Sequence, residues 1–284
     1  MTKKNVKEDE DRRMPVKNMC GRFVLITDLS NIQKNFNIQD ISCEYKPSWN
    51  IAPSQLIPAV INHGGINQLV CFRWGLIPSW SKDPSIANKL INARAETVDK
   101  KPSFRDAFKK RRCLIVADGF YEWKKEGKSK MPLYFYLKSG RPFGFAGLYE
   151  TWISPDKKEI NTCVIITTAA NELISPIHDR MPVILSNEQG IVWLDSDMVD
   201  VSGKIRQLVQ DTVNIGNVAF CDSVDFLYQI VRVDQGDAVV LESVMVGLRI
   251  DERAIGRVDH RDGFQSRRAT FRAGTASARH DGSP

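Results

Sequence analysis

The residue with the most distinctive chemistry in the sequence is Cys20, which directly follows Met19. Cysteine is small enough for a preceding initiator methionine to be removed, and the exposed residue then carries an α-amine and a thiol on adjacent carbons. An α-amine has a pKa of roughly 7.7–8.0, so it condenses with an aldehyde to a Schiff base, which the thiol closes to a thiazolidine ring. The alternative is a buried strand cysteine that packs as a small hydrophobe. Arg22, two residues on, then requires an anionic partner.

A second candidate is Glu122, which stands between Tyr121 and Trp123. We expect the two aromatic rings to desolvate its carboxylate. Desolvation raises a carboxyl pKa and allows the group to act as an acid and a base near neutral pH. The alternative is a glutamate paired with a neighbouring arginine.

His178 opens a third polar segment, followed by Asp179 and Arg180. A histidine can shuttle protons near neutral pH, and an arginine can bind phosphate. The alternative is a structural His–Asp pair.

Aromatic and basic residues interleave between residues 74 and 97. Trp74 and Trp80 flank a Gly- and Pro-containing loop, and Asn92 and Arg94 follow. Tryptophan can stack on unpaired bases, and arginine can hold phosphate. The alternatives are core packing for the tryptophans and a turn or cap role for Asn92.

Several other chemistries are absent from the sequence. It has no phosphate loop, no GxGxxG dinucleotide motif, no HExxH and no GxSxG. The histidines are scattered, and no two cysteines are closer than 23 residues, which excludes a CxxC zinc pair. We therefore expect no metal and no cofactor. The first 18 residues carry ten charged side chains and no apolar signal region, so no export signal is recognisable. Without such a signal we expect the thiols to be kept reduced, and we therefore also expect no disulfide framework.

Composition is that of a globular protein: of 284 residues, 42% are hydrophobic and 26% are charged. No apolar run approaches the roughly 20 residues of a spanning helix, so we expect no membrane partner. A net charge of +6 permits a polyanionic partner without proving one.

Charge is distributed unevenly along the chain. All 20 lysines lie at or before Lys204, whereas the last 80 residues hold 10 of the 20 arginines. A separate C-terminal segment under different constraints explains this shift, and so does an end of different origin. We expect a disordered charged leader at 1–18, one domain at 19–245, and a disordered Arg-rich tail at 246–284.

Between these ends the pattern predicts many strands and few helices. Helices are expected at 29–36, near Ser103 with a capping box to Asp106, and at 202–210. Strands are expected in runs rich in Val, Ile, Phe and Tyr, at 20–26, 56–61, 67–74, 113–117, 134–137, 143–150, 162–168 and 182–185. This pattern favours an α+β fold, mostly antiparallel β and barrel-like, with short flanking helices.

Seven segments in fixed order resemble one family. They are MCGRF, WGLIPSW, INARAET, RCLIVADGFYEW, FAGLYETW, TTAAN and IHDRMPVIL, spread from Met19 to about Leu194. Together they are similar to the SOS-response-associated peptidase (SRAP) family, whose members shield abasic sites in single-stranded DNA. The resemblance implies a compact, mostly β, barrel-like domain.

The resemblance also implies roles for individual residues. Cys20 matches the family's crosslinking cysteine, Asn92 the residue that orients the sugar, Glu122 the carboxylate that assists ring opening, and His178 the residue that promotes Schiff-base steps. The positions that match the DNA-binding groove are Arg22, Trp74, Arg94, Thr168 and Arg180.

Two features depart from the family pattern. The nitrogen of Cys20 is an amide here, because 19 residues precede it. A start at Met19, which we favour, removal of the leader by autoproteolysis, or an inactive or thiol-only variant would each account for this. From about Asp195 the usual Val-rich closing strand is not recognisable, so we expect it to be missing or replaced.

The function expected from the sequence is a covalent cap on abasic sites, with weak lyase activity from the same Schiff base. The partner is single-stranded DNA, and the protein is expected to be a monomer in the cytoplasm, associated with the nucleoid when bound to DNA. One alternative is a non-covalent binder of single-stranded DNA or modified bases in which Cys20 stays internal. Another is a cysteine autopeptidase that acts only on its own leader through Cys20, Glu122 and His178.

Overall fold

The computed structural model describes residues 21–127, 129–195, 203 and 218–222 of the chain. All of them belong to Met1–Leu248, the first of two units into which the chain divides. The predicted leader and tail lie outside the described residues, as does the helix expected at 202–210 except for Gly203.

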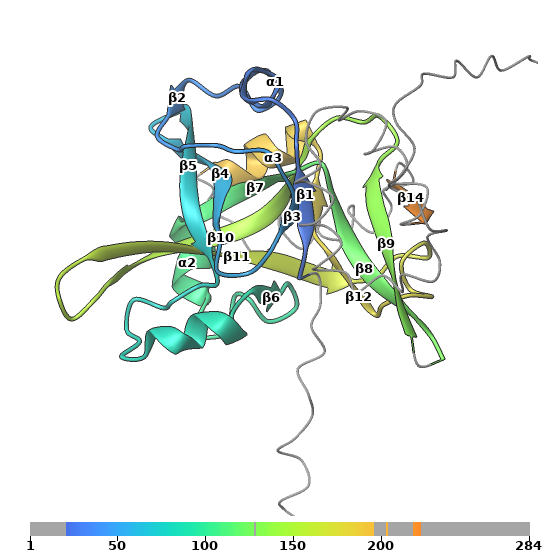
Figure 1. Ribbon diagram of the computed structural model, residues 1–284. Coiled ribbons are helices and arrows are strands. Elements are labelled where there is room, and N and C mark those ends of the chain that lie inside the picture. The colour runs from blue at the N-terminus through green and yellow to red at the C-terminus, as the bar shows by residue number, and fades with distance from the viewer. Residues whose placement is uncertain (1–20, 128, 196–202, 204–217, 223–284) are drawn as a thin grey trace, which may run out of the picture. The chain divides into compact units, whose positions relative to one another are not determined.

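The larger sheet closes on itself as a ring of five strands (Figure 1). Going round the ring, β4 (Leu56–His63) pairs with β5 (Ile66–Trp74), which pairs with β11 (Glu159–Ala169), then β10 (Phe143–Ile153), then β7 (Arg112–Ala117), and so back to β4. Only the β5–β11 contact in this ring is parallel. The barrel-like, mostly antiparallel α+β fold predicted from the sequence is therefore confirmed.

Short strands extend the ring at its margins. β6 (Asn92–Arg94) and β12 (Arg180–Pro182) both pair with β11, the first in parallel and the second antiparallel. β2 (Asp40–Ile41) pairs with β5, and β13 (Ile184–Leu185) pairs with β10. Two of the predicted site segments, at residues 92–94 and 180–182, therefore lie beside the same strand.

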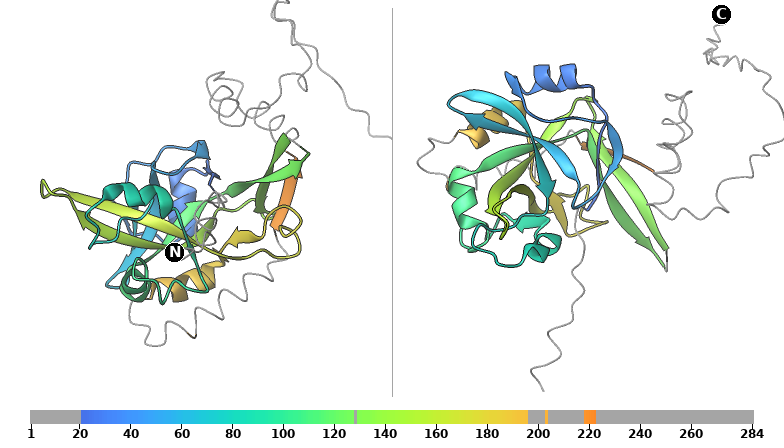
Figure 2. Two further views of the ribbon diagram at one scale, coloured as in Figure 1. Left: turned by 90° about the horizontal axis from the view of Figure 1, so that it is seen from below. Right: turned by 60° about the vertical axis from the view of Figure 1, so that its left-hand side comes forward.

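The second sheet has the strand order β14-β9-β8-β1-β3 (Figure 2). Its members are β1 (Phe23–Leu25), β3 (Ser48–Ile51), β8 (Gly119–Glu126), β9 (Ser129–Leu137) and β14 (Val218–Asp222). The strand β14 pairs antiparallel along β9. The strand β14 lies beyond Leu194, where the segments that resemble the family end. It covers the edge of β9, although the Val-rich closing strand of the family is not recognisable in this part of the sequence.

Strand β8 approaches β9 closely at Gly119. A Cβ on this residue would lie 2.5 Å from the Phe135 carbonyl oxygen and 2.4 Å from the Tyr134 ring. Only glycine fits this position, which begins the strand that carries Glu122.

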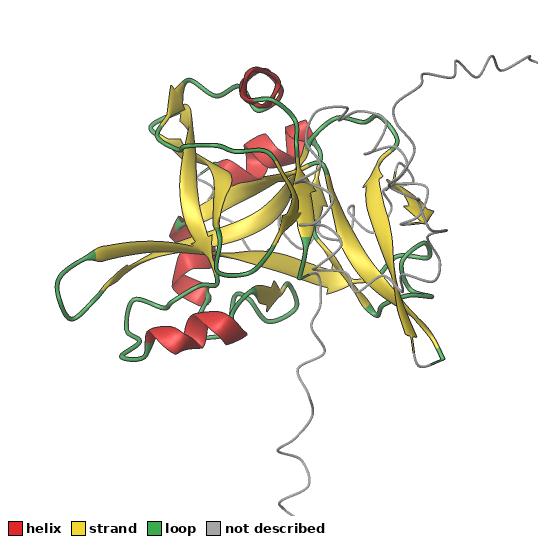
Figure 3. Ribbon diagram, viewed as in Figure 1, coloured by secondary structure: helices red, strands yellow, loops and turns green. Residues whose placement is uncertain are grey.

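Helices cover the outside of the barrel (Figure 3). They are α1 (Leu29–Asn35), the 3-10 helix η2 (Pro84–Lys89), α2 (Arg105–Lys110) and α3 (Asn187–Leu194). Helix α1 is capped by Asp28, whose carboxylate accepts from the Asn31 N–H at 2.9 Å. Hydrogen bonds from Ser30 and Asn31 lower the pKa of Asp28 to about 2.

The helix predicted near Ser103 exists as α2, but its predicted capping box does not. The residue at the N-cap of α2 is Phe104, which makes no side-chain capping bond, so the box predicted between Ser103 and Asp106 is wrong. A capping box does exist in α3, between Ser186 and Gln189, which the sequence analysis missed. The chain already turns helically before α2, so Ser103 is not at the boundary where a cap would act.

The core fills the ring and the space between the two sheets. Phe23 of β1 contacts Trp74 of β5, with ring centroids 5.4 Å apart, and Phe145 of β10 at 5.9 Å. Phe120 of β8 also meets Phe145, at 6.0 Å. These buried aromatic contacts fix the second sheet against the barrel, and each buries a large apolar area.

A disulfide joins Cys43 and Cys71, whose Cα atoms are 5.0 Å apart. The expectation of no disulfide is wrong for this pair. Cys43 follows β2, which runs parallel to β5, and the pairing of Ile41 with Leu69 brings the two cysteines side by side. Sequence spacing cannot show this proximity, because 28 residues separate them. Cys113 and Cys163 are buried free thiols, and burial raises the pKa of both.

Candidate functional site

Strand β11 brings one group of the predicted residues together. On one side it pairs with β6, placing Asn92 opposite Ile165 and Arg94 opposite Thr167. On the other side it pairs with β12, placing Arg180 opposite Ala169. Four of the predicted residues, Asn92, Arg94, Thr168 and Arg180, therefore lie on three adjacent strands.

Arg180 is held by several hydrogen bonds. Its two terminal nitrogens donate to the two carboxylate oxygens of Glu96 at 2.5 and 2.9 Å. The Nη2 atom also donates to the Thr167 carbonyl at 2.7 Å. A two-point arginine–carboxylate pair fixes both distance and orientation, so the guanidinium plane has a defined position beside β11.

The carboxyl of Glu96 responds to this pair. Partial burial alone would raise its pKa, but the hydrogen bond from Arg180 and the positive charges of Arg180 and Arg94 hold the pKa below its usual value of 4.5. Glu96 was not singled out in the sequence analysis, although it lies in the INARAET segment. Its partner is 84 residues away, and no local pattern points to it.

His178 lies just before β12, with only 13% of its side chain exposed. Its Nδ1 accepts from the Arg180 backbone N–H at 3.0 Å and also lies 3.0 Å from an Asp179 carboxylate oxygen. The two contacts exclude each other, because Nδ1 accepts only when it carries no proton and donates only when it does. The backbone bond belongs to the neutral ring with its proton on Nε2, and the contact with Asp179 belongs to a ring protonated at Nδ1.

Glu122 is a buried acid in β8, only 1% exposed. Burial was predicted, but its cause differs from the one expected. Successive side chains of a strand point to opposite faces, so Glu122 shares its face with Phe120, while Tyr121 and Trp123 lie on the other. The carboxyl is therefore buried on the face of β8 that carries Phe120, which contacts Phe145 of the barrel, and not between the two flanking rings.

The described residues begin at Gly21, and the backbone that follows it runs beside the strand that carries Glu122. The Arg22 carbonyl accepts from the Tyr121 N–H at 3.0 Å, and Phe23 pairs with Phe120. The backbone next to Glu122 is thus bonded to the backbone next to Gly21. Cys20 itself lies outside the described residues.

Arg22 was expected to require an anionic partner. Its Nη1 instead donates to the amide oxygen of Asn50 at 2.7 Å. This neutral acceptor satisfies one donor of a half-buried guanidinium and leaves its positive charge uncompensated by that contact.

The two tryptophans of the WGLIPSW segment differ sharply. Trp74 is 1% exposed, and its indole N–H donates to the Ile91 carbonyl at 2.9 Å. Core packing is therefore the correct interpretation of Trp74, and its ring has no free face for a base. It still bears on the site, because it joins Phe23 to the residue before Asn92. Trp80 is 59% exposed and offers a ring to solvent.

The loop that carries Trp80 is held from the β10–β11 hairpin. Trp152 is 4% exposed and donates its indole N–H to the Ser81 carbonyl at 2.7 Å. Ile77 of the same loop donates its N–H to the Thr162 hydroxyl oxygen at 3.0 Å. Trp152 and Thr162 had not been predicted as supports, because their contacts are 71 and 85 residues away in sequence.

Thr168 is 5% exposed and pairs with Met181. As with Trp74, its burial places it beneath the surface formed by its neighbours. Arg94, at the other margin of β11, is exposed.

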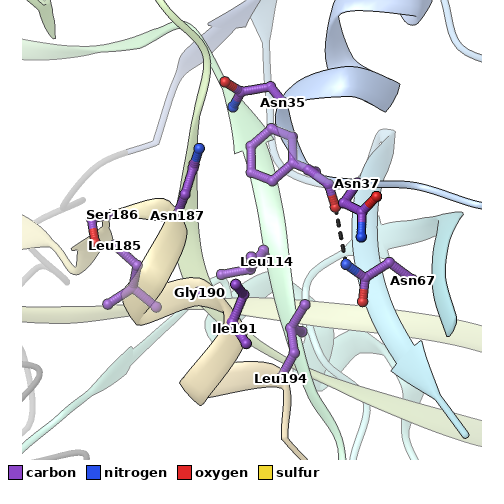
Figure 4. A pocket seen from close by; sticks show the side chains of 11 residues that line it. Asn35, Asn37, Asn67, Leu114, Leu185, Ser186, Asn187, Gly190, Ile191 and Leu194 are labelled. Atoms are coloured by element: carbon purple, nitrogen blue, oxygen red, sulfur yellow. Dashed lines mark hydrogen bonds between the residues drawn. The ribbon is translucent and has the colours of Figure 1, made fainter. Parts of the chain in front are cut away.

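A cavity of about 90 Å³ lies elsewhere, between α1, α3 and the start of β5 (Figure 4). Its floor is formed by Leu114, Leu185 and Leu194, with asparagines at the rim. None of the predicted site residues lines this cavity.

Among the described residues, no helix is long and apolar enough to cross a membrane. The same part of the chain contains no group of three His, Cys, Asp or Glu side chains arranged to hold a metal ion.

Comparison with known proteins decides the family. The model of the SOS response associated peptidase (SRAP) family matches residues 19–219. The chain belongs to this family. The match includes both groups of site residues and continues into β14, beyond the end estimated from the motifs.

Named members of the SRAP family are similar to this chain over most of their length. It is 51% identical over 185 residues to abasic site processing protein YoqW of Bacillus subtilis, covering 64% of this chain and 83% of that protein. It is 31% identical over 192 residues to abasic site processing protein YedK of Escherichia coli, covering 66% and 82%. A solved structure from Bacteroides thetaiotaomicron has a TM-score of 0.64 at 25% identity, covering 72% of this chain and 91% of that one.

Proposed function

We propose that this SRAP protein processes abasic sites in single-stranded DNA by capturing the lesion covalently through Cys20. The relatives at 51% and 31% identity are both named for abasic site processing, which supports the substrate. A lesion without a base has no edge to read, so selectivity depends on the sugar and the phosphates.

The reaction is balanced without a cofactor. The α-amine of Cys20 adds to the C1′ aldehyde of the ring-opened sugar, and loss of one water gives a Schiff base. The thiol then adds to the imine carbon, and its proton passes to the nitrogen, which closes the thiazolidine. This requires a free α-amine, and therefore a mature chain that begins at Cys20.

The observation that carries the proposal is the placement of Glu122. This acid is 1% exposed, and the neighbouring residue of its strand is hydrogen-bonded to Arg22, two residues after Cys20. The abasic sugar exists mainly as a closed hemiacetal, so a proton must reach the ring oxygen before the aldehyde is free. We assign this proton transfer to Glu122.

The other roles follow the resemblance to the family. We assign the orientation of the sugar to Asn92 and the Schiff-base proton transfers to His178. Contact between His178 Nδ1 and the Arg180 N–H would leave the proton on Nε2, where the ring can donate it.

Phosphate contacts are assigned to the arginines of the site: Arg22, Arg94 and Arg180. Trp74 and Thr168 are buried, so we assign them to supporting the groove from beneath. The exposed ring of Trp80 supplies the base-stacking surface first considered for both tryptophans.

Two further activities accompany this proposal. The Schiff base also permits β-elimination, so a weak lyase activity competes with ring closure. A leader before Cys20 must be absent or removed. If Cys20 removes it by autoproteolysis, the Cys20→Ala variant of the full chain retains the leader, whereas translation from Met19 never produces it.

A crosslinking assay tests the proposal. The wild-type protein is mixed with a single-stranded oligonucleotide carrying one abasic site and then denatured. With the wild-type protein we expect an adduct that survives without a reducing agent. Cys20→Ala and Cys20→Ser keep the α-amine but lack the thiol, so we expect each to give only a Schiff base, which is trapped when a reducing agent is added. An oligonucleotide without the lesion is the control. A stable adduct with Cys20→Ala would refute the role of Cys20, and retention of DNA without any adduct would favour the non-covalent binder.

A further inference from the structure

Positive charge is concentrated in one stretch of the chain. Residues 82–112 contain ten basic and four acidic residues, a net charge of +6, which equals the formal net charge of all 284 residues. This stretch begins after Trp80, passes through Asn92 and Arg94, and ends at the start of β7. It therefore connects the candidate site with helix α2.

Helical geometry starts before α2 itself. The Arg105 N–H donates to the Lys101 carbonyl at 2.9 Å, and the Phe108 N–H donates to the Phe104 carbonyl at 2.8 Å. Residues four apart on a helix lie on one face, about 6 Å apart along the axis. Lys101, Arg105 and Lys109 therefore form one row, which we call the basic stripe, and all three are exposed.

The face of this segment that adjoins the basic stripe is buried. Phe104, Ala107 and Phe108 are each at most 3% exposed and belong to the main core. The packing of this apolar face fixes the direction of the basic stripe, which cannot rotate without exposing two phenylalanines.

Helix stability does not explain the basic stripe. Cations near a helix C-terminus are favourable, which accounts for Lys109, but cations at the N-terminal end oppose the helix dipole. Lys101 precedes the helix and Arg105 is its first residue. Arg105 has only a loose pair with Asp106, at 3.7 Å between exposed groups. Within the described part of the chain neither Lys101 nor Lys109 forms an ion pair.

The basic stripe is joined to the site through the backbone. The Thr97 N–H donates to the Arg94 carbonyl at 3.1 Å, and the Thr97 carbonyl accepts from the Lys101 N–H at 3.0 Å. Consecutive turns thus connect Arg94, at the margin of β11, with the first residue of the stripe.

We propose that the basic stripe binds backbone phosphates of the single strand that flanks the lesion, and so extends the binding site beyond the abasic nucleotide. This inference rests on the proposed function, because the polyanion is the same DNA strand. Arg94 lies at the boundary between the lesion and the stripe, and Lys101, Arg105 and Lys109 follow in order along the strand.

The inference makes a quantitative prediction about salt. Each phosphate neutralised on a single strand contributes about 0.7 to the slope of log affinity against log salt concentration. Three contacts therefore contribute about 2 to that slope. Loss of the stripe should lower affinity at about 0.1 M salt on the order of 10- to 100-fold.

The test compares the triple variant K101Q/R105Q/K109Q with the control variant K34Q/K138Q/R141Q. The control also removes two lysines and one arginine, all exposed, and its Lys34 lies in the last turn of α1 as Lys109 does in that of α2. Helices α1 and α2 lie on opposite sides of the barrel (Figure 1). The ligand carries a reduced abasic analogue without an aldehyde, so that only non-covalent affinity is measured.

Oligonucleotides of two lengths distinguish binding to the basic stripe from binding at the lesion site. With an oligonucleotide of about 25 nucleotides, we expect the stripe variant to lose affinity and its salt slope to fall by about 2. With one of about 5 nucleotides, we expect its affinity to stay within about twofold of wild type, which also shows that the variant is folded. The charge-conserving variant K101R/R105K/K109R should retain the wild-type slope.

Equal losses in the stripe and control variants would overturn the proposal, because they would indicate a general effect of net charge. An unchanged slope of log affinity against log salt concentration in the stripe variant would overturn the proposal as well. Failure of the proposed function is distinguishable, since it appears as absence of a crosslink between the wild-type protein and DNA that carries a true abasic site.

Discussion

Glu96 and Arg180 form a two-point ion pair across β11, with N–O distances of 2.5 and 2.9 Å. The arginine side chain is 13% exposed and that of the glutamate 50%. Residues separated by 84 positions thus connect the end of β6 to the start of β12, and this pair sets the position of Arg180 in the site.

Replacing Glu96 with Gln should lower the free energy of unfolding at neutral pH by about 1 kcal/mol, because a half-exposed but two-point pair is lost. The pKa of Glu96 is lowered in the folded protein, so the unfolded state binds the proton more readily. The stabilisation is present above the usual value of 4.5 and is lost as pH falls through the folded pKa. Urea unfolding of both proteins at neutral and acidic pH measures this, and a difference that grows towards low pH would contradict it.

Replacing Glu122 with Gln should slow crosslinking by about 10²- to 10⁴-fold, the usual contribution of a general acid or base. The amide has the same size but cannot deliver the proton that opens the sugar. The rate of adduct formation at saturating protein is the measurement. The matched control is Tyr121→Phe, which removes the hydroxyl that bonds Trp49 on the other face of the strand and should leave the rate unchanged. Equal rates for wild type and E122Q would remove Glu122 from the mechanism.

The two tryptophans should respond oppositely to alanine substitution. Trp80→Ala should weaken single-strand binding by about 1–3 kcal/mol, the value of one stacked base, without changing stability. Trp74→Ala should destabilise the fold by about 3–5 kcal/mol, because it empties a buried site. Thermal unfolding and binding measured on both variants check this. Loss of stability in the Trp80 variant alone would reverse the assignment.

Arg112 should be among the most important residues for stability. It is 5% exposed and donates to four main-chain carbonyls, those of Phe108, Lys109, Trp193 and Asp195. Arg112→Met keeps the bulk but leaves these acceptors without their donor, so we expect a loss of about 3 kcal/mol or more in the free energy of unfolding.

The control for this prediction is Arg141→Met, at an exposed position, which should change stability by at most about 0.5 kcal/mol. Denaturant unfolding of both variants provides the comparison. Similar small effects in the two would mean that the carbonyls find other partners.

Features of the fold that have a clear pattern in a short stretch of sequence were predictable. The strands of the ring are apolar runs, and β4, β5, β7, β10 and β11 all fall where such runs were expected. The run that forms β8 contains Glu122 and two lysines, so its pattern does not indicate a strand, although it carries the central acid of the site.

Features that depend on distant pairing were not predictable. Both tryptophans lie in one short Gly- and Pro-containing segment, and the contacts of Trp74 with Phe23 and Ile91, which bury its ring, are distant in sequence. The disulfide between Cys43 and Cys71 likewise depends on the pairing of β2 with β5.

The candidate site residues were selected for their chemistry and for their resemblance to a family. The structure shows which of them lie close together. Asn92, Arg94 and Arg180 gather around β11, whereas Glu122 lies in the other sheet next to β1. No periodicity in the sequence predicts which sheet a residue joins. The expected monomer and the role of each residue remain predictions.

The most direct test of the account is the mass of the intact protein before and after incubation with an abasic single-stranded oligonucleotide. The account predicts a chain that begins at Cys20, and an adduct whose mass is that of protein plus oligonucleotide less one water, stable to denaturation without reduction. A chain that retains residues before Cys20 and still forms this adduct would contradict the thiazolidine mechanism, because the nitrogen of Cys20 would then be an amide. A chain that begins at Cys20 and forms no adduct would contradict covalent capture altogether.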